Sequence, residues 1–401
     1  MSNKVKNPKI KEISQTLKEP EWLLVWREKQ LALASELPKS IKHGIGISAL
    51  FPEMEPDFAS TAEYHVDASK GLEIYTWSEA VTQEEIEPIL KGLMESAFFP
   101  APKDFFRASG HAQFRSGLVI YVQPNMKEDG TFIEEKLTLD TMAQSTSSSD
   151  VVVVIVKEGA KFDFVSTISG GGEGSVHTRT LVVLTEADAS VRVTQQNNMT
   201  SGAMAMHFSR GIVAGNSKLV WRELLLGEML TSSITDTLLI GAGARTTVLQ
   251  GIVATYTAVI DVDVSAQHMA DDTHSNIATA GVGKDTSRTL YRGLVDMKSG
   301  VHKVEGKQEA RFLSLTPTAK IDAIPSLDIA SNDVTCAHKL SISHVREGDT
   351  FYPKLRGLSD EESRALFLEG HFAHVFSGDE NADMIKVITE LQRHSLDKHA
   401  I

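Results

Sequence analysis

The sequence predicts a mainly β protein whose central part is a parallel β-solenoid, with helical regions on either side. Short segments rich in β-branched and aliphatic residues recur between residues 105 and 345, and amphipathic runs of helix length are almost absent there. The segments lie at 118–122, 151–156, 180–185, 219–226, 246–253 and 259–264. A long stretch with strands and hardly any helices indicates an all-β core.

Polar corners separate these segments at nearly constant intervals. Successive intervals of 29, 28 and 27 residues join the corners at Ala160, Ala189, Ser217 and Ala244. Two further steps of 28 residues reach Asp272 and Gly300, again in turns. A fixed period of this length is typical of stacked repeats, and strand-rich repeats favour parallel coils that hydrogen-bond to their neighbours.

The alternative fold is a long antiparallel sandwich. Such sandwiches usually turn every 8–12 residues, often at Asn-Gly or Asp-Gly hairpins. The only such pair after residue 105, Asp129-Gly130, lies outside the periodic stretch. The spacing therefore favours the solenoid.

The flanking regions have helical patterns. We divide the chain into an N-terminal helical or α+β region (1–104), the solenoid core (105–350) and a C-terminal helical region (351–401). Helices are expected at about 21–37 and 86–98, with Pro88 in the first turn of the second. In the last region Ser359 and Glu362 fit a capping box, and a further helix is expected at about 381–394.

Composition argues against several classes of protein. The formal net charge is −13, which disfavours nucleic acid or an anionic membrane as the main partner. The longest aliphatic run is residues 151–156, whereas a membrane-spanning helix needs about 20 apolar residues. Cys336 is the only cysteine, so the chain alone forms no disulfide and no all-cysteine metal site. A cytoplasmic protein is expected, because no apolar signal segment follows the N-terminal lysines.

Two motifs invite a functional interpretation that their chemistry does not favour. The glycine-rich stretch 169–174 (SGGGEG) lacks the lysine of a phosphate-binding loop and carries Glu173, so a flexible corner between two coils is favoured. His371 and His374 are three residues apart and would share a helix face, but no third metal ligand lies near them in the sequence.

Paired aspartates offer an enzymatic alternative. Asp261/Asp263 or Asp271/Asp272 would serve a β-helical enzyme that cleaves carbohydrate, although such pairs are more often solvated turn residues. This alternative also needs a groove lined by aromatic side chains, and aromatic residues make up only 6% of the chain.

The strongest candidate site is Cys336-Ala337-His338. In a strand the cysteine and the histidine point to the same face, because side chains alternate with period two. Thiolate and imidazole together suit iron, zinc or an iron–sulfur cluster. His344 shares the face if the strand continues. One thiol on one face does not complete a cluster site, so ligands from a second chain are required; a buried cysteine beside an unrelated histidine is the alternative.

Several stretches together resemble the SufB/SufD family of iron–sulfur cluster assembly proteins. The resemblance spans nearly the whole chain and is strongest from residue 287 to 372. The matching stretches are 20–23 (PEWL), 116–124 (SGLVIYVQP), 287–293 (SRTLYRG), 322–329 (DAIPSLDI), 332–338 (NDVTCAH) and 351–359 (FYPKLRGLS).

The resemblance implies a right-handed parallel β-helix between helical regions, in agreement with the period count. It also implies a complex with a SufB-like subunit and a SufC-type ABC ATPase docked on the C-terminal region, with sulfur supplied indirectly by a cysteine desulfurase. A transient Fe–S cluster would form at the subunit interface. Cys336 and His338 match the family's C-x-H positions, which makes His338, and with it Cys336, the expected metal and cluster ligands.

We therefore expect a non-catalytic scaffold subunit, most like SufD because the chain has one cysteine. A SufB-like role, or a homodimer of this chain, is the alternative within the family. The sequence leaves the cluster type and any flavin open.

Overall fold

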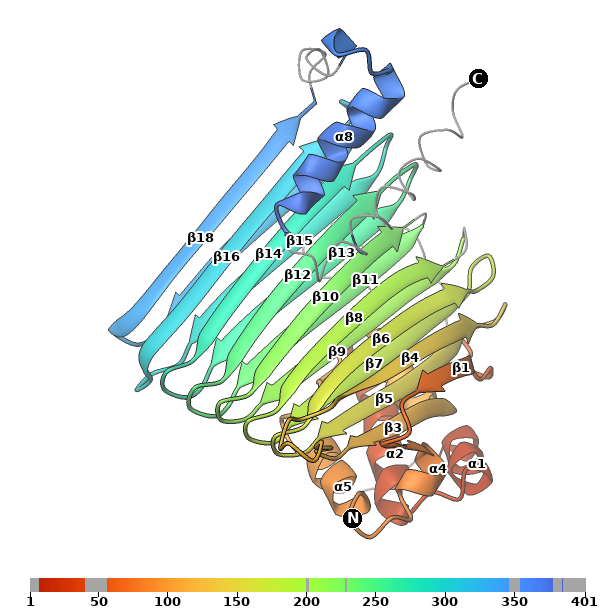
Figure 1. Ribbon diagram of the computed structural model, residues 1–401. Coiled ribbons are helices and arrows are strands. Elements are labelled where there is room, and N and C mark those ends of the chain that lie inside the picture. Colours follow the sequence, from red (N-terminus) through yellow and green to blue (C-terminus); the bar gives the residue numbers. More distant parts are fainter. Residues whose placement is uncertain are drawn as a thin grey trace.

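The computed structural model describes residues 7–39, 56–199, 202–227, 229–345, 354–377 and 384. Figure 1 shows two long sheets stacked face to face, with the N-terminal helices near one end and a C-terminal helix near the other. The chain forms a parallel β-solenoid of about seven turns, which confirms the predicted fold class.

Alternate strands along the chain join alternate sheets. Each sheet has nine strands in the described part of the chain. The first contains, in spatial order, β1 (Glu63–Ala68), β4 (Glu134–Ala143), β6 (Lys161–Gly170), β8 (Ser190–Met199), β10 (Lys218–Gly227), β12 (Arg245–Ala254), β14 (His274–Gly283), β16 (His302–Ser314) and β18 (Asp333–His344). The second contains β2 (Leu72–Thr76), β3 (Ser116–Val122), β5 (Ser148–Val156), β7 (Val176–Thr185), β9 (Met204–Val213), β11 (Leu230–Leu239), β13 (Val259–His268), β15 (Arg288–Met297) and β17 (Lys320–Ile329).

Strand direction decides between the two folds considered from sequence. From β3 and β4 onward, neighbouring strands of each sheet pair in parallel, in continuous registers such as β10 with β12 and β13 with β15. Only β1 with β4 and β2 with β3 pair antiparallel among the described strands. The antiparallel sandwich is therefore excluded.

The predicted corners stack directly on one another. The backbone N–H of Asp188 donates to the carbonyl of Gly215 at 2.9 Å, and that of Asn216 donates to the carbonyl of Ala242 at 2.9 Å. Asp188 and Asn216 have φ values of 58° and 55°, a left-handed conformation that asparagine, aspartate and glycine tolerate best. The period in the sequence therefore corresponds to one tight turn in each coil.

Helices of the N-terminal region cover the outer face of the second sheet at its first strands (Figure 1). They are α1 (Pro8–Thr16), α2 (Glu21–Glu36), α4 (Trp77–Ala80), α5 (Glu87–Glu95) and α6 (Phe105–Gln113). Helices α2 and α5 confirm the two predicted near residues 21–37 and 86–98, with Pro88 in the first turn of α5. No helix among the described residues is long and apolar enough to cross a membrane.

Helix α8 (Asp360–Ala373) lies along the outer face of the first sheet (Figure 1). Its predicted capping box is present: the Ser359 Oγ accepts from the Glu362 N–H at 3.2 Å, and a Glu362 carboxylate oxygen accepts from the Ser359 N–H at 2.8 Å. The apolar contact with the sheet involves Leu224, Leu249, Val253, Ala280, Val282, Leu313, Leu368, Phe372, Val375, Phe376 and Met384. The helix predicted at about 381–394 lies outside the described residues, apart from Met384.

Two glycine substitutions test the tight stacking of the corners. A Cβ on Gly241 would lie 2.2 Å from the backbone nitrogen of Gly215, so Gly241→Ala should cost about 1–3 kcal/mol, because the backbone of the preceding coil must move. Gly92 lies inside α5 with no atom within 4 Å of an added Cβ, so Gly92→Ala should stabilise by about 1 kcal/mol. Urea unfolding of both variants measures the difference. Equal effects would contradict the close approach of the coils.

Candidate functional site at the open end of the solenoid

The two ends of the solenoid differ. At the N-terminal end, β1 and β2 pair antiparallel with the first coil, and Tyr64, Leu72 and Ile74 pack against the interior core. At the other end, β18 pairs with β16 and β17 with β15, and neither has a second partner among the described strands. We call β17 and β18 the open end, because in the described part of the chain one edge of each strand has no neighbour.

The candidate residues Cys336 and His338 lie on β18. Val334, Cys336 and Leu340 pack against the interior core, so the even-numbered side chains of this strand face inward. His338 belongs to the same alternating set, which places it on the face predicted from the period of two. Cys336 is half-buried and His338 is exposed.

The opposite wall of the open end is β17. Ile321, Ala323 and Leu327 pack against the interior core, yet each is only partly buried. Larger apolar side chains remain exposed nearby: Ile324 is 47% exposed, Ile329 43% and Ile342 44%. Apolar surface and unpaired strand edges at one place are features that proteins usually cover.

A network of charges links the open end to α8. Glu309, on β16, contacts Arg311 at 2.7 Å, Lys339 of β18 at 3.2 Å and His374 at the end of α8 at 3.2 Å. Partial burial opposes ionisation, but the hydrogen bonds from Arg311, His374 and Lys339 lower the pKa of Glu309 to about 2. A displacement of α8 would therefore act on both β16 and β18.

The donor atoms at the open end do not complete a metal site by themselves. Among the described residues, no three side chains of histidine, cysteine, aspartate or glutamate converge on one point. Cys336 and His338 supply one sulfur and one imidazole.

The other sequence candidates are placed elsewhere. The stretch 169–174 joins β6 to β7, and a Cβ on Gly172 would lie 2.5 Å from the carbonyl oxygen of Ser145, which gives this glycine a packing role. His371 Nε2 lies 3.2 Å from the carbonyl oxygen of Gly281, and His374 contacts Glu309. Each interaction ties α8 to the first sheet.

The two aspartate pairs lie in different surroundings. Asp271 and Asp272 lie in an exposed turn. Asp261 and Asp263 lie on β13, which contains the strand predicted at 259–264, and there Arg292 of β15 and Lys103 neutralise them at 2.8 Å and 3.1 Å respectively. Burial raises the pKa of Asp261 to about 6 despite the charge of Arg292. With both carboxylates paired to cations, no acid–base pair faces an open groove there.

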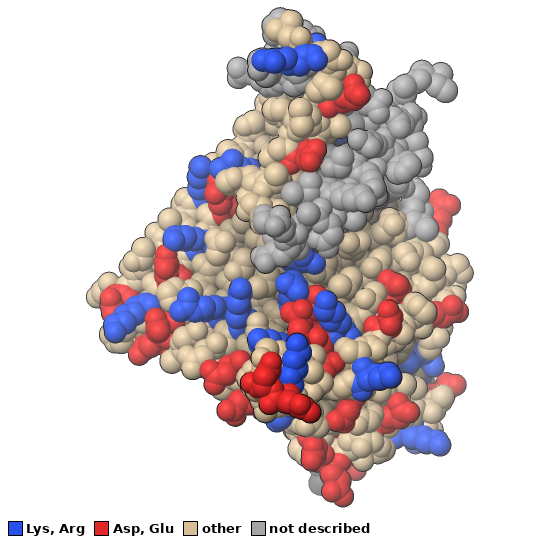
Figure 2. Space-filling view, viewed as in Figure 1, with Lys and Arg blue, Asp and Glu red and all other residues tan. Residues whose placement is uncertain are grey.

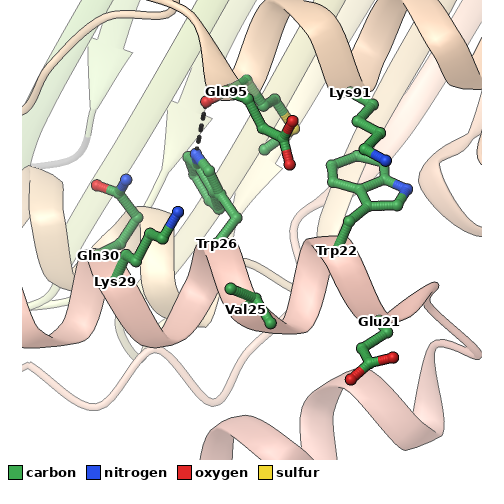
Figure 3. A pocket seen from close by; sticks show the side chains of 9 residues that line it. Glu21, Trp22, Val25, Trp26, Lys29, Gln30, Lys91 and Glu95 are labelled. Atoms are coloured by element: carbon green, nitrogen blue, oxygen red, sulfur yellow. Dashed lines mark hydrogen bonds between the residues drawn. The ribbon is translucent and has the colours of Figure 1, made fainter. Parts of the chain in front are cut away.

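A groove of about 570 Å³ lies between α2 and α5, at the opposite end of the molecule from β18 (Figures 1 and 3). Two tryptophans line it. The indole N–H of Trp26 donates to the carbonyl of Met94 at 2.9 Å, and that of Trp22 donates to the Glu87 carboxylate at 2.7 Å. These bonds join the two helices, which accounts for both tryptophans as structural residues.

Sequence reasoning missed the polar interior of the solenoid. Arg179 is 2% exposed and Asp150 is fully buried, and the two form an ion pair inside the rod. Farther along, Glu223, Tyr291 and Gln308 are also buried. Alternation within each strand is the only signal that points to these positions, because polar residues there fall on the face shared with core valines and leucines.

Figure 2 shows acidic and basic side chains interspersed over the visible face, with no continuous field of either sign. Together the fold and the open end define a class: a parallel β-solenoid with the antiparallel strands β1 and β2 at one end and a cysteine–histidine pair at the other.

A family model described as "SUF system FeS cluster assembly, SufBD core domain" matches residues 139–371, more than half of the chain. The chain therefore belongs to the SufBD family, a family of iron–sulfur cluster assembly proteins.

Relatives support this assignment over most of the chain. An iron–sulfur cluster assembly SufBD family protein of Staphylococcus saprophyticus is 24% identical over 409 residues, covering 90% of this chain and 86% of its own. Proteins of the same description from Staphylococcus aureus strain USA300 and Staphylococcus haemolyticus are 25% and 24% identical, with the same coverage.

Proposed function

We propose that this protein is a SufD-like scaffold subunit, without catalytic activity of its own, that holds iron and sulfide at the open end while a cluster is built. The observation that carries the proposal is the position of Cys336 and His338 on β18, the last described strand of the rod. One is half-buried and the other exposed, so both are reachable from a docked partner.

The partner we propose for the open end is a SufB-like subunit. The unpaired edges of β17 and β18 would continue the two sheets into it, and the exposed isoleucines nearby would be covered. The cluster ligands that this chain lacks would come from that subunit. A second copy of this chain is the alternative partner, and the SufB-like role is the alternative function.

We propose that residues 351–401 dock a SufC-type ABC ATPase, and we retain the division at residues 104 and 350. Support comes from Leu366, which is 51% exposed on α8, and from the network around Glu309. ATP-driven movement of α8 would reach β18 through that network. The cargo is a transient iron–sulfur cluster, and we place the protein in the cytoplasm with sulfur supplied by a cysteine desulfurase.

His338→Ala is expected to lose most of the cluster while leaving the complex assembled. The variant is co-expressed with the SufB-like and SufC-type subunits, and iron, acid-labile sulfide and visible absorbance are measured on the purified complex. Cys336→Ala should have a smaller effect if the imidazole is the main ligand. His65→Ala is the matched control, because His65 is also exposed on a strand but belongs to β1 at the other end of the solenoid.

A normal cluster content in the Cys336→Ala/His338→Ala double variant would overturn the ligand role. Mass spectrometry of the wild-type complex separates the two roles within the family. A persulfide on Cys336 would favour the SufB-like alternative.

Charging the apolar surface of the open end should prevent partner binding. Replacing Ile324 and Ile342 by Asp is expected to lower the affinity for the SufB-like subunit at least tenfold, because two carboxylates must then be desolvated. Size-exclusion chromatography coupled to light scattering measures complex formation and any homodimer. Met126→Asp is the control, since Met126 is 58% exposed away from this end. Unchanged binding by the Ile324/Ile342 variant would show that partners bind elsewhere.

A further inference from the structure

A chain of hydrogen bonds, partly buried at Gln195 and buried beyond it, runs along the inside of the solenoid toward the open end. Its side chains come from successive strands of both sheets. The donors and acceptors are Gln195 Nε2 to Glu223 (3.1 Å), Gln250 Nε2 to Glu223 (2.7 Å), Thr279 Oγ1 to Gln250 Oε1 (3.0 Å) and Gln308 Nε2 to the Tyr291 hydroxyl (3.3 Å). The Tyr291 hydroxyl also lies 3.4 Å from Thr279 Oγ1, which can accept its proton. The chain ends at Gln308, one strand before β18.

Gln308 has one polar atom that no group satisfies. The side chain is 2% exposed, and its Nε2 is used by Tyr291. Its Oε1 is buried and has no hydrogen-bond partner. A buried acceptor without a donor destabilises the folded state, so an unsatisfied oxygen at this position needs a physical reason.

The neighbour of Gln308 across the ladder is His338. The two residues are register partners in the parallel pairing of β16 with β18, where strands lie about 4.8 Å apart. Both belong to the inward-facing sets of their strands. In the described part of the chain, His338 makes no side-chain hydrogen bond.

Gly293 on β15 allows Gln308 to reach across the interior. A Cβ at residue 293 would lie 1.7 Å from the Gln308 Nε2 and 2.8 Å from the Tyr291 hydroxyl oxygen. The amide of Gln308 therefore occupies the space that any other residue at 293 would fill. This packing fixes the position of the amide, and the hydrogen bond to the Tyr291 hydroxyl places Nε2 toward β15.

We propose that Gln308 is a positioning residue for His338, and that its Oε1 accepts a hydrogen bond from one ring nitrogen of His338 when a partner covers the open end. That bond fixes the tautomer of the imidazole and leaves the other ring nitrogen free to bind iron. The proposal rests on the proposed function, in which His338 is the iron ligand.

The test uses Gln308→Leu, which removes the acceptor at similar volume, in the complex with the SufB-like and SufC-type subunits. Nitrogen-15 NMR of labelled histidine should show one tautomer of His338 in the wild-type complex and a mixture in the variant. Iron retention against a chelator should fall about tenfold. Gln308→Glu, which keeps an acceptor, should restore both readouts in part.

Two more variants separate positioning from folding. Gly293→Ala leaves Gln308 in the chain but displaces its amide, so it should reproduce the tautomer mixture. Gln195→Leu breaks bonds of the same kind far from His338 and should leave the tautomer unchanged.

An identical tautomer population in wild type, Gln308→Leu and Gly293→Ala would overturn the inference. A changed tautomer with unchanged iron retention would support the positioning of His338 by Gln308 and would count against the proposed ligand role instead.

Discussion

Lowering the pH from 7 to 5 should reduce the free energy of unfolding by about 5 kcal/mol. Burial lowers the pKa of His111 to about 3 and of His177 and His268 to about 4, from an ordinary value near 6.5. Between these values the unfolded chain binds protons that the folded chain does not, so stability falls as the pH falls. At pH 5 each of the three costs about 2 kcal/mol, at 1.36 kcal/mol per pH unit.

Other buried groups modify this dependence. Burial also lowers the pKa of His207, which adds to the loss. Burial raises the pKa of Asp261 to about 6, so the folded chain binds a proton there before the unfolded chain does. This carboxyl therefore adds about 1 kcal/mol to the free energy of unfolding as the pH falls from 7 to 5. Burial raises the pKa of Glu223 as well, which acts in the same direction as Asp261. The histidines outweigh the two acids.

Urea unfolding at pH 7, 6 and 5 measures how the free energy of unfolding changes with pH. One variant shows how much of that change comes from His268. His268 accepts or donates bonds at 2.8 Å to Thr273 and Ser275, so His268→Gln keeps a polar group there without the titration. The variant should lose about 2 kcal/mol of the pH dependence, whereas His65→Gln, at an exposed site, should keep all of it. A pH-independent wild type would contradict the burial of these neutral rings.

Removing the carboxylate of Asp150 should cost about 3–5 kcal/mol, because it leaves the guanidinium of Arg179 buried without a counterion. Arg179 Nε donates to both Asp150 oxygens, at 2.9 Å and 3.1 Å, and its remaining nitrogens reach Ser166 and Thr141. Burial works against ionisation of Asp150, but the charge of Arg179 overcomes it and lowers the pKa of this carboxyl.

The variants to compare are Asp150→Ala and the apolar double variant Asp150→Leu/Arg179→Met. Urea unfolding should show the large loss for the single change and recovery of much of it for the double change, because the double variant leaves no unpaired charge. The hydroxyl of Tyr64, in β1, also donates to Asp150 at 3.1 Å. The single change should therefore loosen β1, which faster hydrogen exchange in this strand would show. A loss below about 1 kcal/mol would contradict the buried pair.

The solenoid was predictable because its repeat is local. One turn per coil requires a left-handed residue at a fixed interval, and Asp188, Asn216 and Gly243 appear at that interval. The same-face placement of Cys336 and His338 followed from strand alternation. The ion pair of Asp261 was not predictable, since its counterion Arg292 is 31 residues away and becomes a neighbour only through the register of β13 with β15.

The amino-acid sequence alone determined the parallel coils, the helices that flank them and the candidate ligands Cys336 and His338, because turn chemistry, side-chain periodicity and donor type are local properties. Only the tertiary structure decided that β18 is an edge strand among the described residues, and that Gln308 lies beside His338. Both depend on which strands become neighbours, and that is set by the stacking of distant segments rather than by any one of them.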